Sequence, residues 1–173
     1  ETSFILPVEF VYPEVNNRIQ RLGSPQWTIA VDKATATYIT EDFTPDEIAR
    51  KIKERITARR YEDEIAGTTV TVQGNDVSVD TTREGRNIFI QKYMLADDVS
   101  TTRWKFPEQN LWLDISKAEL GAMIQAGAAH IQSCFTWESD QYDAVATALA
   151  DVDPITSLLA LEDTLFPVVN EFN

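Results

Sequence analysis

Residues that support catalysis or covalent cross-linking are scarce in this sequence. Its 173 residues include one cysteine, Cys134, and one histidine, His130. A single cysteine cannot form a disulfide within the chain, and any His-dependent triad would have to use His130. No stretch approaches the roughly 18 apolar residues that a membrane-spanning helix needs, so we expect no membrane insertion.

Basic residues are scarce as well. Fifteen Lys and Arg stand against 28 Asp and Glu, which gives a formal net charge of −13, and no Lys or Arg follows Lys117. Such a surface repels phosphate, and nucleic-acid affinity rests largely on Lys and Arg that replace counterions. We therefore expect no nucleic-acid partner. The acidic surface indicates either simple solubility, the favoured interpretation, or a docking face for a basic partner.

The first 43 residues are predicted to form a β-rich arm. The apolar segment Phe4–Tyr12 contains Pro7, which cannot donate a hydrogen bond to a central ladder, so an edge strand or an extended arm is expected there. Segments 26–32 and 35–40 are rich in strand-forming residues and predict a hairpin. In that hairpin we expect Trp27, Ile29 and Val31 on one face and Asp32-Lys33 at the turn.

A helix is predicted over residues 45–66. Thr44–Glu47 combines a capping box with proline at the first helical position, and Gly67 is a natural stop. Isoleucine recurs every four residues, at positions 48, 52 and 56. The basic run from Arg50 to Arg60 is predicted to form a solvent-exposed face laced with salt bridges, with a partner surface as the alternative.

Two hairpins and a second helix are expected next. Segments 69–72 and 77–80 predict a hairpin around the turn 73–76, and segments 103–106 and 111–115 predict another around 107–110. Thr81 or Thr82 is expected to cap the intervening helix. Its inward positions are predicted to be Ile88, Tyr93 (or Lys92) and Leu95.

The strongest helical pattern begins at the capping box Ser116–Glu119. Apolar and small residues follow with three-four spacing at Leu120, Met123, Ile124, Gly127, Ile131, Cys134 and Phe135. This helix either continues to Leu149 or restarts after a kink near Trp137. Asp153-Pro154 predicts a short further helix.

Together these elements predict an α+β fold. A β-rich N-terminal arm precedes a helix–hairpin–helix–hairpin–long helix unit, and a short C-terminal helix follows. The predicted domains are the arm at 1–43, the α+β domain at 44–153 and the C-terminal helix and tail at 154–173.

The residues that could carry chemistry have simpler structural explanations. His130 and Cys134 form a pair of possible metal ligands on one helical stripe, which Glu138 continues. A structural zinc site needs four ligands and a catalytic one about three, and nothing in the sequence indicates the others. The pairs Asp97-Asp98 and Asp151/Asp153 could serve glycoside hydrolysis, yet caps and loop ends explain them better. We therefore predict no catalytic, cofactor-binding or metal-binding residues and expect no enzyme.

Two tryptophans flank the turn of the second predicted hairpin. Trp104 and Trp112 are expected to pack in the core or an interface, since aromatic cross-strand pairs stabilise hairpins. The alternative is that they are exposed stacking platforms for a sugar.

Six blocks between residues 44 and 153 occur in a characteristic order. They are Arg59–Ile65, the Val70–Val79 hairpin, Asp80–Ile88, Arg103–Lys105, Leu111–Leu120 and Ala129–Glu138. In this order the segment resembles a domain of unknown function that recurs in bacteriophage tail-fibre and tail-associated proteins. Trp137 departs from that pattern, which has a polar or charged residue before the glutamate.

This resemblance implies that the protein is located in the phage tail. It implies no catalytic residues. We expect a structural virion protein of the baseplate or tail-fibre region, made in the host bacterial cytoplasm and present in several copies. Its partners would be other tail proteins, which it would contact through the arm at 1–13 by adding a strand to a neighbour's sheet. The alternatives are a tail-fibre assembly chaperone that leaves before maturation and a carbohydrate-binding or carbohydrate-degrading tail module.

Overall fold

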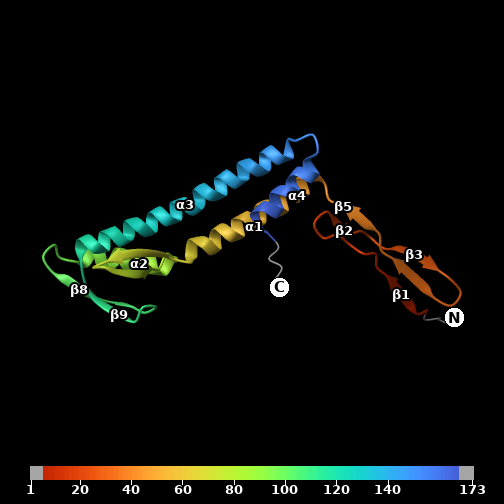
Figure 1. Cartoon of the computed structure of the whole chain (residues 1–173). Helices are drawn as coiled ribbons and strands as arrows, with labels where there is room; N and C mark the ends of the chain where they lie inside the picture. Colours follow the sequence, from red (N-terminus) through yellow and green to blue (C-terminus); the bar gives the residue numbers. More distant parts are fainter. Residues whose placement is uncertain (1–5, 168–173) are drawn as a thin grey trace, which may run out of the picture. The chain divides into compact units, whose positions relative to one another are not determined.

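The computed structural model describes residues 6–167 and has the α+β fold that the sequence predicts (Figure 1). Five short strands come first: β1 (Val8–Val11), β2 (Gln20–Leu22), β3 (Gln26–Ile29), β4 (Ala34–Thr37) and β5 (Thr40–Asp42). After them come α1 (Pro45–Ile65), the hairpin β6 (Thr68–Val72) and β7 (Asn75–Val79), and α2 (Arg83–Leu95). The chain continues with the hairpin β8 (Thr101–Phe106) and β9 (Leu111–Ser116), then α3 (Lys117–Leu149) and α4 (Pro154–Leu165).

The chain divides into two compact units. One contains the described residues up to Ile52 together with those from Val145 onward, and the other contains Lys53–Ala144. No described helix has both the length and the apolar character required to cross a membrane.

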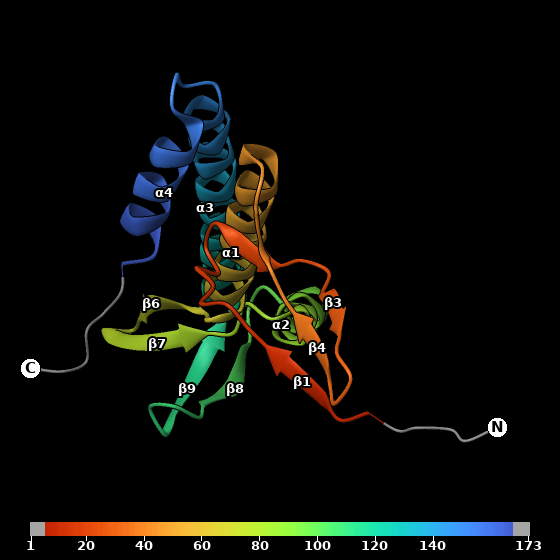
Figure 2. The same ribbon diagram turned by 90° about the vertical axis from the view of Figure 1, so that its right-hand side faces the viewer.

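The first unit contains a three-stranded sheet, which we call the arm sheet. Its strand order is β1-β4-β3, with β4 in the centre, β1 parallel to it and β3 antiparallel (Figure 2). The predicted edge strand and the predicted hairpin are therefore confirmed, while Phe4 lies outside the described residues. The expectation for Val31 is wrong, because the chain leaves β3 at Ile29 and Val31 lies fully exposed in the turn.

The helical part of the first unit is fixed by caps and by one arginine. The Thr44 capping box forms as predicted, with Thr44 N donating to Glu47 Oε2 at 2.8 Å and Glu47 N donating to Thr44 Oγ1 at 3.3 Å. Arg18, in the segment before β2, contacts Glu162 on α4 at 2.8 Å. Its Nη2 also donates to the Leu159 carbonyl at 3.2 Å, so this side chain joins the strand segment to α4.

Within the second unit, α1 ends before Gly67, which has the positive φ of 86° expected of a helix stop. Thr81 is fully buried there; its hydroxyl accepts from Gly67 N at 3.0 Å and donates to the Glu64 carbonyl. The hairpin β6–β7 turns through Gln73 and Gly74, both with positive φ. The turn is thus tighter than the predicted 73–76, because two residues suffice when both adopt left-handed geometry.

Helix α2 starts at the N-cap Thr82, whose hydroxyl accepts from Gly85 N at 3.1 Å. Its predicted inward residues are wrong: Ile88, Lys92, Tyr93 and Leu95 are exposed, and Gly85 and Phe89 are buried instead. Apolar residues at 88–90 and 93–95 cover about half of the helix, so spacing alone did not identify the buried stripe. The Phe89 ring stacks on Trp104 at 4.8 Å, and this contact determines which stripe faces inward.

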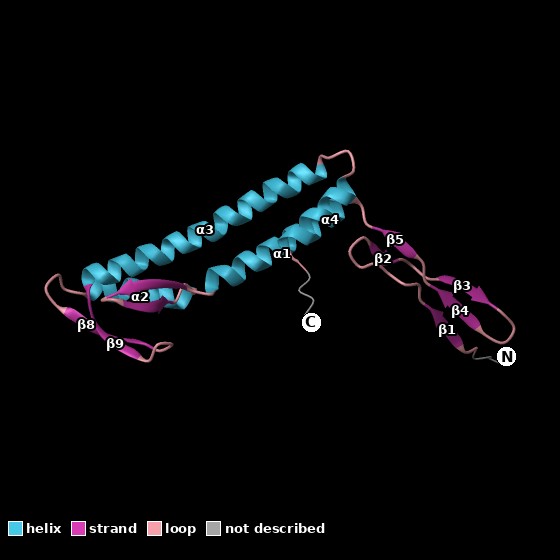
Figure 3. Ribbon diagram, viewed as in Figure 1, coloured by secondary structure: helices cyan, strands magenta, loops and turns pink. Residues whose placement is uncertain are grey.

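Helix α3 is one unbroken helix through Leu149 (Figure 3), so there is no restart near Trp137. The Ser116 capping box forms as predicted, with Ser116 N donating to Glu119 Oε2 at 2.8 Å.

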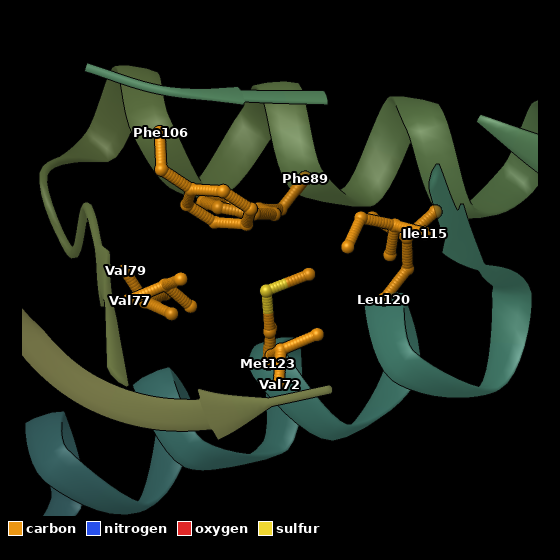
Figure 4. Packing of buried hydrophobic residues seen from close by; sticks show 8 residues of the cluster. All are labelled: Val72, Val77, Val79, Phe89, Phe106, Ile115, Leu120 and Met123. Atoms are coloured by element: carbon orange, nitrogen blue, oxygen red, sulfur yellow. The ribbon is translucent and has the colours of Figure 1, made fainter. Parts of the chain in front are cut away.

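The core of the second unit lies where α2, α3 and both hairpins meet. Its buried members are Val72, Val77, Val79, Phe89, Phe106, Ile115, Leu120 and Met123. Figure 4 shows Met123 reaching from α3 toward Phe89 and Phe106, with Val77 and Val79 beside them. Two of the predicted α3 positions, Leu120 and Met123, are thus central to this core.

Candidate protein-interaction site

The three residues predicted to share a stripe of α3, His130, Cys134 and Glu138, contact other parts of the second unit. His130 Nε2 donates to the Asp63 carbonyl on α1 at 2.8 Å, since a carbonyl can only accept. That bond occupies the nitrogen that faces Cys134 Sγ at 3.8 Å. His130 therefore links two helices and does not present a free base to the thiol.

Cys134 is buried and its thiol is protonated at neutral pH. Burial raises the pKa of the Cys134 thiol, and the Asp63 carboxylate raises it further. In the described part of the chain, no group of three or more His, Cys, Asp or Glu side chains is arranged to hold a metal ion.

Glu138, the third member of the stripe, belongs to an ion cluster that is mostly buried, with only Arg86 partly exposed. The cluster consists of Arg60 and Glu64 on α1, Arg86 on α2 and Glu138 on α3. Arg60 pairs with Glu64 and lies 3.3 Å from Glu138, while Arg86 lies 3.7 Å from Glu64. Glu138 also accepts from the Thr57 hydroxyl at 2.7 Å, so its charge is well compensated.

The predicted solvent-exposed basic face is wrong for Arg60. Only 14% of its side chain is exposed, and its guanidinium lies 4.7 Å from the centre of the Phe135 ring. The neighbouring Arg59 is half-exposed, lies 3.8 Å from Asp63 and sits over the Trp137 ring. Because α3 packs along this side of α1, one member of the basic run is enclosed.

Three members of the predicted carboxylate pairs have structural partners. Asp98 pairs with Lys117 at 3.0 Å. Asp153 caps α4 by accepting from Thr156 N at 3.3 Å. Asp151 accepts from the Ser157 hydroxyl at 2.6 Å and from Val152 N, and these bonds lower the pKa of its carboxyl.

The two hairpin tryptophans lie on opposite faces of β8–β9. Trp104 pairs in register with Leu113 and stacks on Phe89, as core packing predicts. Trp112 pairs with Lys105 on the other face and is half-exposed. They do not form the predicted cross-strand pair, because a strand's side chains alternate between faces.

A groove of about 330 Å³ lies between α2 and α3 in the second unit. Its lining is mainly apolar and includes Phe89, Ile90, Met123 and Phe135. Arg86, which is engaged with Glu64, is one of its few polar residues. Its chemistry does not single out a particular ligand.

The arm sheet offers the most open surface for a partner. Cross-strand register places two rows on one face: Val8, Ala34 and Ile29, then Phe10, Ala36 and Trp27. The opposite face carries Glu9, Thr35 and Thr28 in the corresponding row. Only the two alanines of the first face are buried, so the arm sheet has almost no core of its own.

In the described part of the chain, no strand pairs with the outer edge of β1. The carbonyls of Pro7 and Val11 accept from Ala34 N at 3.0 Å and from Tyr38 N at 2.9 Å, so these residues face β4. Because the hydrogen-bonding groups of successive residues point to alternate sides of a strand, the N–H groups of Val8 and Phe10 point to the free edge. Tyr12 continues this segment and stacks on Tyr38 at 4.8 Å.

Sequence reasoning identified the β1 edge but missed three features. The parallel pairing of β1 with β4 joins segments about 25 residues apart and leaves no local sequence signal. The buried position of Glu64 and its contact with the partly exposed Arg86 likewise depend on tertiary packing. Neither residue departs from an ordinary surface pattern in the sequence.

Comparison with known proteins places the whole of the second unit, with short flanking segments, in a family. Residues 47–156 match the model of a domain of unknown function, DUF4376. Neither the curated proteins nor the solved structures include a match to the chain. Since the matched residues make up more than half of the sequence, the chain belongs to the DUF4376 family.

Proposed function

We propose that this protein is a structural virion component of a tailed bacteriophage, located at the baseplate or tail-fibre region. It acts through protein–protein contacts and not through catalysis. The phage tail is suggested by the ordered blocks between residues 44 and 153. The mode of action is suggested by the arm sheet, whose apolar residues and free edge have no covering element among the described residues.

The open edge of β1 is the observation that carries the proposal. Its outward N–H groups at Val8 and Phe10 can pair with the edge strand of a partner, and strand addition obtains its affinity from such main-chain bonds. Proteins usually protect exposed edges with charge, proline or bulges. Here Pro7 precedes the strand and Glu9 is its one charged residue, so most of the edge is unprotected.

The structural use of the polar residues supports a role outside catalysis. His130 holds a backbone carbonyl, Cys134 is protonated and buried, and Glu138 is bound by Arg60 and Thr57. A catalytic base or nucleophile needs an accessible group with a suitable pKa. These groups instead hold α1 and α3 together.

Substitution at Val8 tests the edge directly. Val8→Pro removes the outward N–H while keeping an apolar side chain and the hydrogen bonds to β4. Val8→Ala shortens the same side chain and keeps the N–H, so it is the matched control. In a phage that carries the gene, we expect Val8→Pro to lose incorporation into particles and Val8→Ala to retain it, with circular dichroism of both purified chains unchanged.

Equal incorporation of the two Val8 variants would contradict strand addition at β1. Deletion of residues 1–13 is a coarser test of the arm, and normal incorporation of that deletion would exclude the docking role altogether.

A carbohydrate-binding module is the second candidate, and one observation favours it. Trp112 is half-exposed, as a sugar-stacking platform would be, with the Arg103 guanidinium 5.9 Å and the Lys105 ammonium 5.8 Å from its ring centre. This candidate predicts that host glycans quench tryptophan fluorescence and that Trp112→Phe abolishes the response. The chaperone alternative instead predicts that the protein is absent from mature particles.

A further inference from the structure

The apolar face of the arm sheet is large for a surface that no element between residues 6 and 167 covers. The exposed fractions of its main residues are 46% for Val8, 51% for Phe10, 59% for Tyr12, 57% for Trp27 and 75% for Ile29. A small sheet is stable in water only when one face packs against another layer. The face therefore needs an occupant.

We propose that the occupant is the same face of a second copy of this chain. The two cross-strand rows contain no charged side chain, although the chain as a whole carries a net charge of −13. A neutral face avoids opposing like charges when two strongly acidic copies meet. A two-fold axis would bring the same patch of both copies together, as in most homodimers.

The exposed area of the apolar face is large enough for two copies to form a specific interface. Aromatic side chains bury 150–250 Å² each when fully covered, so the exposed parts of the three aromatics with Val8 and Ile29 supply roughly 500 Å² per copy. A pair would bury about 1,000 Å², the lower bound of a specific protein interface. Two small sheets packed face to face at about 10 Å form an ordinary sandwich.

Packing through this face leaves the edge of β1 free, because the face and the edge point in perpendicular directions. Self-association and strand addition to another protein are thus compatible. The inference goes beyond the proposed function and holds whether or not the protein resides in a phage particle.

Lysine substitutions on the two faces of β3 test which side of the arm sheet mediates self-association. Ile29→Lys places a charge on the apolar face, and Thr28→Lys places the same charge on the opposite face one residue earlier. Both native side chains are exposed, so neither change disturbs a core. Sedimentation velocity of the full chain should give twice the 19.5 kDa chain mass for the native protein and for Thr28→Lys, and a single chain mass for Ile29→Lys.

Mixing oppositely charged variants tests whether the partner is the same face. The face is three strands wide, which is about 10 Å at the usual spacing of about 4.8 Å between strands. The Debye length at about 0.1 M salt is also about 10 Å, so charges at position 29 of two packed copies are close enough to interact. Ile29→Lys and Ile29→Glu should each be monomeric, and their equimolar mixture should regain the double mass.

Three results would overturn the inference. They are a monomeric native chain at every concentration, equal dissociation by Thr28→Lys and Ile29→Lys, and a mixture of the charged variants that stays monomeric. Each leaves the Val8 incorporation assay unaffected, so the self-association and the docking role fail independently.

Discussion

The Arg60 guanidinium on α1 lies 3.3 Å from the Glu138 carboxylate on α3, and the two side chains are only 14% and 15% exposed. The same guanidinium pairs with Glu64. Although its Nε atom has no hydrogen bond of good geometry, the charge is balanced by both carboxylates and by the face of the Phe135 ring. This cluster holds α1, α2 and α3 together beside the hydrophobic core of the second unit.

Removing Arg60 should therefore destabilise the protein strongly. Arg60→Ala leaves Glu64 and Glu138 enclosed without their main counter-charge, and loss of one partner from a buried ion pair costs about 3–5 kcal/mol. Urea unfolding followed by circular dichroism should show this loss. Arg59→Ala is the control, because its exposed pair with Asp63 at 3.8 Å and its contact with the Trp137 ring are each worth no more than about 1 kcal/mol at an exposed site. Equal effects of the two variants would contradict the buried cluster.

Gly85 should be intolerant of alanine even though it lies in a helix. A Cβ atom there would stand 2.3 Å from Asp80 Cγ and 2.6 Å from Asp80 Cβ. Asp80 is itself held by the bond from Thr82 N at 2.8 Å. The resulting clash should cost about 1–3 kcal/mol and exceed the gain of about 1 kcal/mol in helix propensity.

The control for Gly85→Ala is Asn87→Ala, an exposed site two residues further along α2. That change should raise the free energy of unfolding by a few tenths of a kcal/mol, because alanine is the better helix former. A stabilising Gly85→Ala would show that Asp80 moves aside freely.

The thiol of Cys134 should react slowly in the folded protein. Its pKa is raised by burial and then by Asp63, so at a given pH below the pKa it has less reactive thiolate than an ordinary cysteine. Iodoacetamide should modify the native chain at least about tenfold more slowly near pH 7 than the urea-unfolded chain. The native rate should also continue to rise with pH beyond about 8.5, where an ordinary thiol is half ionised. Similar native and unfolded rates would contradict this environment.

Salt should strengthen the self-association of the native chain. Each copy carries a net charge of −13, and salt screens the repulsion between copies while leaving the apolar contact intact. The dissociation constant measured by sedimentation should fall as sodium chloride is raised from about 0.05 M to 0.5 M. Weaker association at high salt would indicate that ion pairs hold the copies together.

Local signals in the sequence predicted most of the elements. The capping boxes at Thr44 and Ser116 form the expected hydrogen bonds, and Gly67 ends α1 with the expected positive φ. Such features depend on residues three or four positions apart, so they can be derived without knowledge of the tertiary fold.

The remaining features depend on distant residues. The burial of Arg60 requires α3 to lie against α1, and the buried stripe of α2 is selected by Trp104 on β8. The apolar face of the arm sheet arises when β1 pairs with β4 in a register that aligns Phe10 with Ala36. No local spacing in the sequence encodes these three arrangements.

The most direct test of the proposed function is quantitative mass spectrometry of purified, mature particles of a phage that encodes this chain. The account predicts a fixed small-integer ratio of this chain to a known tail protein, and an even copy number if the arm sheets pair. A chain that is abundant in the infected lysate and missing from the particles would contradict the structural role and favour the assembly chaperone.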